Sequence, residues 1–217
     1  MSCVAREIKA MTMGLSSERL KASLDILCGI EPRIAAAVAR AGYPEPRINP
    51  RGYATLLRTI IGQQVSYKAA AAVWTKLDAM IGGAEDPANI GRATDETLRA
   101  AGLSRQKSGY ARSLADEVIS GRLDMAALPA DDEAAIAQLV RVKGIGRWSA
   151  EVYLLFAEGR GDIWPAGDLA VQIETGRIMG LDERPDEATT RAIAEAWRPH
   201  RGAAAIFTWH HYKTPVI

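Results

Sequence analysis

The chain has 217 residues, of which 48% are hydrophobic, and its formal net charge is +1. This length accommodates one sizeable hydrophobic core or two small ones. The two cysteines, Cys3 and Cys28, are too few for a disulfide framework, a structural zinc site or a four-cysteine iron–sulfur cluster. We therefore expect a cytoplasmic protein with reduced thiols. Because the net charge is nearly zero, binding to nucleic acid would require a local basic patch.

The first residues, MSCVAREIKAMTMG, lack the apolar stretch of a signal peptide. No apolar run in the chain approaches the ~20 residues that span a bilayer. We therefore expect a protein without a membrane anchor, whose translation starts at Met1, Met11 or Met13.

Helical periodicity dominates the rest of the chain. Leu20, Leu24 and Leu27 recur at helical spacing behind a capping Ser16 or Ser17, and three prolines between residues 43 and 52 exclude a helix there. No strand series or repeat is evident, so the sequence predicts an all-α protein whose chain passes between two lobes near residues 44–50 and 161–167. Further helices are expected over residues 31–41, 53–61, 67–80, 106–119, 131–142 and 147–157, from Asp168 onward, in DEATTRAIAEAW and in HRGAAAIFTWHHY, with short helical patches between residues 86 and 102.

The stretch VKGIGRWSAEVY, residues 142–153, interrupts a helix with Gly144 and Gly146. Both glycines permit a positive φ and a turn without Cβ atoms, and the first N–H groups of the next helix lack intrahelical partners. Such a helix start attracts an anion, to which Ser149 could add a hydroxyl and Lys143 a charge. The natural anion is a DNA phosphate, read without regard to base sequence. The alternative is an ordinary helix–helix turn, because Gly-X-Gly is common.

Asp168 follows Pro165 and Gly167 in DIWPAGD and stands where a helix begins. An aspartate at this position commonly serves only as an N-cap. The alternative is a carboxylate that faces a cleft, where the helix dipole favours its negative charge. A carboxylate of this kind stabilises an oxocarbenium-like transition state. This segment alone leaves both roles open.

Five separated motifs resemble the helix-hairpin-helix DNA glycosylases and occur in that family's order: IIGQQVSYKAA, GLSRQKSGYARSLA, GIGRWSA, WPAGD and WRPHRGAAAIFTW. They are most similar to the AlkA-like 3-methyladenine DNA glycosylases, over residues 45–212. The resemblance implies two helical lobes with a cleft between them. Residues 1–50 with 161–217 would form one lobe, and residues 51–160 the other, with the helix-hairpin-helix motif at about 131–157. It also implies the compact form of the family, without an N-terminal β-rich domain.

By this resemblance Asp168 is the catalytic carboxylate, which stabilises a cationic sugar and directs water to C1′ after the damaged nucleotide is flipped out. Trp148 stands where bifunctional relatives carry a lysine nucleophile, so we expect no Schiff base and no lyase activity. Trp209 matches the aromatic residue that stacks on the extruded base, and a core tryptophan is the alternative. Trp148, Tyr53 and Val152 would line the base pocket, with core packing as the alternative for the last two.

The resemblance also assigns contacts with DNA and ions. Gln64 matches the wedge that fills the gap left by the flipped base, and an ordinary polar helix end is the alternative. The carbonyls of Val140, Val142 and Ile145 match a site for Na⁺ or K⁺, and no other cofactor is expected. Expected DNA contacts are Gln64, Lys143, Gly144, Gly146, Ser149, Arg105 and Lys107, with Arg112 as a further candidate, although a solvated helix face explains Arg105, Lys107 and Arg112 equally well.

The function implied is that of a base-excision repair glycosylase. It would act as a monomer on duplex DNA and release alkylated purines such as 3-methyladenine and 7-methylguanine. One alternative is a sister glycosylase for deaminated bases such as hypoxanthine or uracil. Another is a non-enzymatic helix-hairpin-helix DNA-binding module, and a third is an all-α interaction domain without a DNA role.

Overall fold

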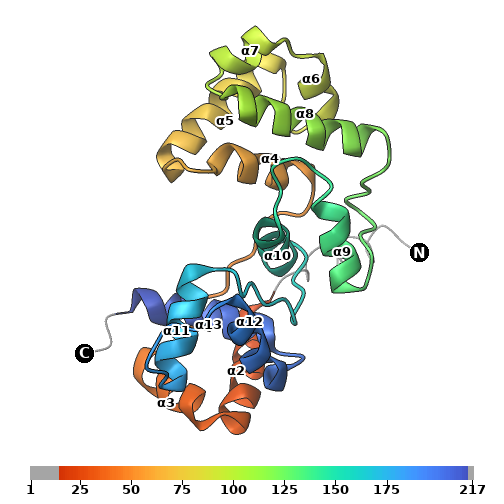
Figure 1. Cartoon of the computed structure of the whole chain (residues 1–217). Helices are drawn as coiled ribbons and strands as arrows, with labels where there is room; N and C mark the ends of the chain where they lie inside the picture. The colour runs from red at the N-terminus through yellow and green to blue at the C-terminus, as the bar shows by residue number, and fades with distance from the viewer. Residues whose placement is uncertain (1–14, 215–217) are drawn as a thin grey trace. The chain divides into compact units, whose positions relative to one another are not determined.

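The computed structural model describes residues 15–214, and within them the regular structure is helical, without a β-strand (Figure 1). The prediction of an all-α protein is therefore confirmed. The expectations about the translation start and Cys3 fall on residues 1–14, outside the described part of the chain. In that described part, every helix is too short or too polar to cross a membrane.

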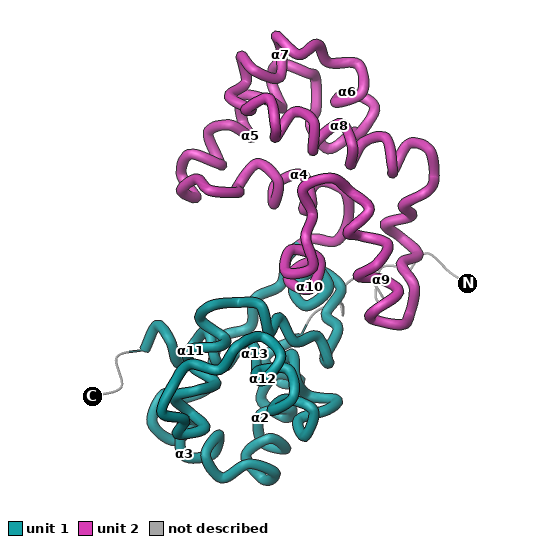
Figure 2. Tube along the Cα trace, in the orientation of Figure 1, with its two compact units in different colours: residues 1–49, 154–217 teal, residues 50–153 magenta. Residues whose placement is uncertain are grey.

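Two compact units divide the chain (Figure 2). Residues 1–49 with 154–217 form unit 1, and residues 50–153 form unit 2. Unit 1 contains α2 (Ser17–Ile30), α3 (Pro32–Ala41), α11 (Leu169–Met179), α12 (Glu187–Ile193), the 3₁₀ helix η1 (Ala194–Trp197) and α13 (Arg201–Lys213). Unit 2 contains α4 (Tyr53–Gly62), α5 (Tyr67–Ile81), α6 (Pro87–Arg92), α7 (Asp95–Ala100), α8 (Arg105–Ile119) and α9 (Asp132–Leu139), and α10 (Arg147–Phe156) contributes to both units.

The second boundary between the units lies inside α10, between Tyr153 and Leu154, whereas the sequence suggests a crossing in the loop at 161–167. The last turn of α10 belongs to unit 1 because the ring of Phe156 packs against Trp209, with ring centroids 5.5 Å apart. The carbonyl of Phe156 also accepts the N–H of Asn49 at 2.9 Å. A continuous helix, rather than a loop, therefore carries the chain from unit 2 to unit 1.

Unit 1 is built around the predicted leucine stripe of α2. Leu20, Leu24 and Leu27 are fully buried, and Ser16 rather than Ser17 caps the helix by accepting the N–H of Arg19. Helix α2 packs against α3, and α13 packs against α11, α2 and α3 (Figure 1). This packing fixes the start of α11, and with it the N-cap residue Asp168, relative to α13.

Unit 2 is organised around α8, which packs against α4, α6 and α7. Leu57, Ile60 and Leu114 are fully buried in this unit. The expected helix over 131–142 ends at Leu139, because the chain turns there into the hairpin that leads to α10. In unit 1 the expected helix in DEATTRAIAEAW divides into α12 and η1.

Candidate DNA interface and active site

The hairpin between α9 and α10 rests against α8. Gly144 adopts a φ of 85°, a conformation that favours glycine. A Cβ atom at Gly144 would lie 2.2 Å from Cδ2 of Tyr110, so the ring of Tyr110 occupies the space that any side chain would need. The N–H of Lys143 donates to Oγ of Ser113 at 3.0 Å. Gly144 is therefore required by backbone conformation and by close packing together.

Gly146 has a different role. Its φ lies outside the positive region that glycine permits, and a Cβ there would meet nothing within 4 Å. The residue is exposed, so the missing side chain leaves the backbone at the start of α10 open. An open helix start is the feature that an anion-binding hairpin needs.

The side chains around the hairpin differ in how far they reach solvent. Lys143 is exposed, as a phosphate contact requires. Trp148 is 46% exposed at the start of α10, whereas Ser149 is only 8% exposed. Ser149 is thus among the buried polar residues, and the contact of its hydroxyl with a phosphate stays a prediction. The neighbouring Arg147 is held by ion pairs with Glu133 and the buried Glu151.

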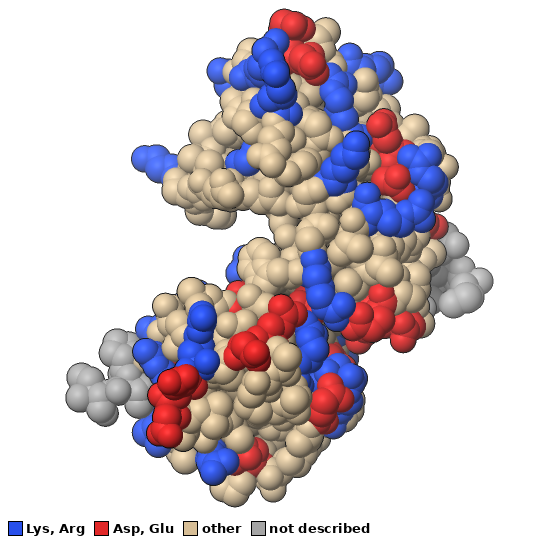
Figure 3. Space-filling model, viewed as in Figure 1, with Lys and Arg blue, Asp and Glu red and all other residues tan. Residues whose placement is uncertain are grey.

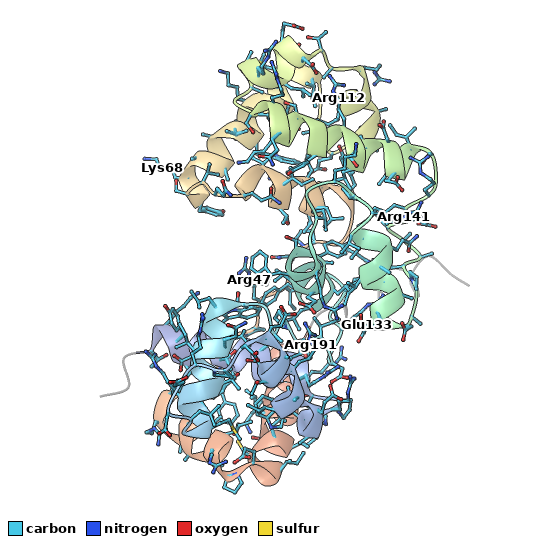
Figure 4. The ribbon with its side chains drawn as sticks, in the orientation of Figure 1. Arg47, Lys68, Arg112, Glu133, Arg141 and Arg191 are labelled. Atoms are coloured by element: carbon cyan, nitrogen blue, oxygen red, sulfur yellow. The ribbon has the colours of Figure 1, made fainter. Side chains whose placement is uncertain are left out.

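The loop after α4 contacts the hairpin directly. Nε2 of Gln63 donates to the carbonyl of Gly144 at 2.8 Å. Beside it, Gln64 is exposed and has a φ of 56°, the only positive φ outside glycine among the described residues. Such strain commonly accompanies functional positions. The next helix starts with Tyr67, 91% exposed, and with the exposed Lys68, whose side chain extends from this first turn of α5 (Figure 4). Sequence reasoning missed both residues, because their exposure depends on tertiary packing.

Lys107 stabilises the same loop from behind. Its Nζ donates to the carbonyl of Ile61 at 2.7 Å, at the end of α4. Burial lowers the pKa of the Lys107 amine. The structure thus uses Lys107 to satisfy a helix C-terminus, where the sequence suggests a phosphate contact or a solvated charge. Arg105 is exposed, whereas Arg112 donates to Asp95 and to the carbonyl of Ala93, each at 2.8 Å.

In unit 1, Asp168 occupies the start of α11 and has two partners on one oxygen. Its Oδ1 accepts the N–H of Val171 at 3.0 Å, which caps the helix. The same atom accepts Nε1–H of Trp209, from α13, at 3.1 Å. The preceding turn is closed by the N–H of Asp168, which donates to the carbonyl of Pro165 at 2.9 Å. The capping role foreseen from sequence is present, and a second donor from a distant helix is added to it.

Trp209 lies in a cluster that contains a second aromatic ring, Phe156, and the guanidinium of Arg47. Trp209 is partly buried and lies against Phe156. The guanidinium of Arg47 sits over the Phe156 ring, with its carbon 4.9 Å from the centroid, and Figure 4 labels this arginine. Neither Phe156 nor Arg47 is identifiable from the sequence, since each lies far along the chain from Trp209.

Tyr53 and Val152 differ in burial. Tyr53 is 7% exposed and its hydroxyl, also buried, has no partner among the described residues. Burial raises the pKa of this phenol. Tyr53 thus belongs to the buried residues, whereas Val152 on α10 is partly exposed. That the two residues line a base pocket stays a prediction. The neighbouring Tyr153 is structural, because its hydroxyl accepts the N–H of Gly52 at 2.9 Å.

No group of three or more His, Cys, Asp or Glu side chains within residues 15–214 could hold a metal ion. The three hairpin carbonyls singled out from the sequence would supply neutral oxygen ligands, which suit hard cations. Of these, the Val142 carbonyl already accepts the N–H of Ile145 at 3.0 Å, and a carbonyl oxygen keeps a second lone pair for a further contact.

The fold and the hairpin together define an all-α helix-hairpin-helix protein, and comparison with known proteins gives the family. Residues 57–199 match the family model of the HhH-GPD superfamily base excision DNA repair proteins. The chain belongs to this superfamily. It is 31% identical over 161 residues to DNA-3-methyladenine glycosylase 1 of Schizosaccharomyces pombe, covering 72% of this chain and 71% of that protein.

Two solved structures are also similar. The crystal structure of a DNA-3-methyladenine glycosidase from Bacillus halodurans is 32% identical, with a TM-score of 0.72, over 85% of this chain and 90% of that one. The Schizosaccharomyces pombe 3-methyladenine DNA glycosylase in complex with abasic DNA is 28% identical, with a TM-score of 0.73, over 88% of this chain and 95% of that one.

Proposed function

We propose that the protein is a monofunctional DNA glycosylase of base-excision repair, which hydrolyses the N-glycosidic bond of alkylated purines and leaves an abasic site. The observation that carries this proposal is the Asp168 carboxylate, whose Oδ1 is held by the N–H of Val171 and by Nε1–H of Trp209. Membership of the repair superfamily and the relatives' activity on 3-methyladenine support it.

In the proposed reaction, a damaged nucleotide leaves the duplex before its base is released. Positive charge then develops on the sugar as the N-glycosidic bond breaks, and the Asp168 carboxylate stabilises that charge and directs water to C1′. The two donors on Oδ1 fix the orientation of the carboxylate, so little reorganisation accompanies the reaction. Duplex DNA is the partner, gripped through the hairpin at Lys143, Gly144 and Gly146, with Gln64 as the wedge.

The proposed substrate class follows from charge and from leaving-group chemistry. N-methylated purines such as 3-methyladenine and 7-methylguanine are cationic, and an indole face attracts a cation by roughly 0.5–2 kcal/mol. They also leave readily, so one carboxylate suffices without a strong general acid. Trp148, half-exposed at the start of α10, offers such a face. Trp209 offers another beside Asp168.

Trp148 also supports the absence of a lyase step, because an indole cannot form a Schiff base with the sugar. The hairpin carbonyls of Val140, Val142 and Ile145 would hold a Na⁺ or K⁺ ion, whose charge would add to the attraction of a DNA phosphate. We propose the protein acts as a monomer on one duplex.

The test compares wild type with Asp168→Asn on duplex DNA treated with a methylating agent. Asparagine keeps an oxygen for Val171 and Trp209 and is a good N-cap, so the substitution removes the charge and little else. We expect release of 3-methyladenine and 7-methylguanine by the wild type, without strand cleavage. Asp168→Asn should lose at least about a hundredfold in turnover, as removal of one preorganised electrostatic group does elsewhere, while still binding DNA.

Asp186→Asn is the matched control. Asp186 caps α12 in the same unit by accepting the N–H of Thr189 at 2.8 Å, so the variant changes an equivalent cap and should keep full turnover. Release of hypoxanthine or uracil instead of methylated purines would assign a sister specificity. Equal function of wild type and Asp168→Asn would identify a non-enzymatic DNA-binding module.

A further inference from the structure

A pocket of about 380 Å³ lies within unit 2, between α7 and α8. Four of its lining residues share one stripe of α8, because they are spaced at i, i+3, i+4 and i+7. The opposite wall is the short helix α7. The lining residues are Asp95 and Arg99 from α7, and Arg105, Ser108, Gly109 and Arg112 from α8.

Ser108 is a polar side chain without a partner in this wall. It is 4% exposed, and its Oγ forms no hydrogen bond with any part of the chain between residues 15 and 214. A buried hydroxyl without a partner lowers the stability of the fold. This arrangement is explained if a ligand in the pocket supplies the missing acceptor.

Gly109 leaves the same wall bare. It lies inside α8, where glycine is a poor choice for helix stability, and its φ lies outside the positive region. A Cβ at Gly109 would meet nothing within 4 Å. Neither backbone conformation nor packing requires a glycine here, and because the residue lines the pocket, a larger side chain would occupy space beside it.

The charges around the pocket favour an anion. Three arginines and one carboxylate line the pocket: Asp95 is paired with Arg112, and Arg99 is paired with Glu96, which lies outside the lining. A hydrogen bond from Arg112 lowers the pKa of the Asp95 carboxyl, and the charges of the three arginines lower it further. Arg112 is held in place by the carbonyl of Ala93 and is labelled on α8 in Figure 4. Arg105 forms no ion pair or hydrogen bond with the described residues, which leaves its guanidinium available.

The pocket uses a different face of α8 from the one beside the hairpin. Lys107 reaches Ile61 and Tyr110 covers Gly144, whereas the pocket stripe is turned away from both positions by the helical repeat. Basic side chains are visible over α7 and α8 in Figure 3, with acidic side chains of α7 beside them.

We propose that this pocket binds a phosphate group, held by Arg105 and Arg112 and accepting the hydroxyl of Ser108. Guanidinium groups match the geometry of phosphate oxygens and form paired hydrogen bonds with them. The phosphate belongs either to a small phosphomonoester or to the backbone of DNA.

The first experiment titrates inorganic phosphate and, separately, adenosine 5′-monophosphate into the full chain by calorimetry, in a chloride buffer. We compare wild type with Ser108→Ala and Gly109→Leu. Ser108→Ala removes the hydroxyl without adding bulk. Gly109→Leu adds a side chain that occupies the pocket, and leucine has a high helix propensity. Gly91→Ala, which replaces a glycine of α6 outside the pocket where a Cβ has ordinary contacts, is the control.

We expect the wild type and Gly91→Ala to bind phosphate equally, and both pocket variants to bind it at least about tenfold more weakly, since hydrogen bonds to charged groups have this effect. Equal phosphate affinity in wild type and Ser108→Ala would overturn the proposal, and so would the absence of binding in all four proteins. With either outcome, the only effect of Ser108→Ala would be a higher melting temperature, because the variant removes a buried hydroxyl without a partner.

A second arm distinguishes the two sources with undamaged duplex DNA. If Gly109→Leu weakens duplex binding in the same proportion as phosphate binding, the pocket takes a backbone phosphate. If duplex binding is unchanged while phosphate binding is lost, the pocket takes a small phosphomonoester. Neither result depends on glycosylase turnover, so failure of the proposed enzyme activity would leave this test intact.

Discussion

The contact between Trp209 and Asp168 gives the tryptophan a role that ring stacking alone does not. Its Nε1–H donates to Oδ1 of Asp168 at 3.1 Å, while its ring lies against Phe156. Trp209→Phe keeps an aromatic ring and removes the donor. Because a hydrogen bond to a charged group contributes about 1.5–3 kcal/mol, we expect turnover of methylated DNA to fall by about tenfold or more, with KM little changed.

Single-turnover kinetics on methylated duplex DNA check this prediction. Trp197→Phe is the control, because Trp197 is a tryptophan of η1 in the same unit that packs edge-on against Trp164. Full turnover in Trp209→Phe would limit the residue to stacking.

The two hairpin glycines differ in what an added methyl group would do. At Gly144 a Cβ would meet the ring of Tyr110 and a positive φ as well, so Gly144→Ala should destabilise the fold by about 3 kcal/mol. Gly146→Ala should change stability by less than about 0.5 kcal/mol, because its Cβ enters open space. Urea denaturation measures both values. DNA affinity should nevertheless fall in Gly146→Ala, because the added methyl group would cover the open start of α10. Unchanged DNA affinity in this variant would argue against a phosphate contact there.

At the residue scale, the sequence is sufficient where local chemistry decides the outcome. The Asp168 cap and the leucine stripe of α2 are consequences of neighbours within one or two helical turns, and the positive φ of Gly144 is local as well, whereas its packing against Tyr110 is not. Residues whose environment comes from a distant helix are a different case. The burial of Ser149 and the 91% exposure of Tyr67 depend on tertiary packing, which periodicity cannot resolve within a single helix face.

At the scale of the elements, α4 and α8 together position the loop that carries Gln64. Lys107 on α8 bonds the carbonyl of Ile61 at the end of α4, and Gln63 then bonds the hairpin at Gly144. Helix C-termini favour a positive charge. The loop is thus fixed from two sides, which explains how Gln64 is kept at a positive φ.

Lys107→Met separates this structural role from a DNA contact. The methionine keeps most of the apolar stem but cannot donate, so we expect a loss of about 1–2 kcal/mol in unfolding free energy. The salt dependence of duplex binding should be unchanged. Unaltered stability together with a weaker salt dependence would instead place the Lys107 amine on a phosphate.

At the scale of the whole molecule, element type and order follow from the sequence, while the boundaries between units follow from packing. The prolines at 44–50 mark the first boundary because they prevent helix formation. The second lies inside α10, where nothing in the helical pattern changes. The contacts of Phe156 with Trp209 and with the N–H of Asn49 tie the last turn of α10 to unit 1.

The charge of the whole chain also shapes its binding to DNA. With 27 basic and 26 acidic residues, the molecule has almost no net charge to attract a duplex, so affinity must come from a few local contacts. Each lysine that neutralises a phosphate contributes about −0.9 to the slope of log K against log salt. Lys143→Gln should therefore reduce the magnitude of that slope by about one.

Fluorescence anisotropy with an undamaged duplex, over a series of KCl concentrations, measures this slope. Lys76→Gln on α5 has the same charge change at an exposed lysine away from the hairpin, and it should leave the slope unaltered. An equal reduction in both variants would mean that overall charge, rather than the hairpin, governs attraction. If Lys143→Gln has the same slope as wild type, Lys143 does not neutralise a phosphate. The hairpin would then hold the phosphate through the backbone N–H groups at the start of α10, because these neutral donors displace no counterion of their own.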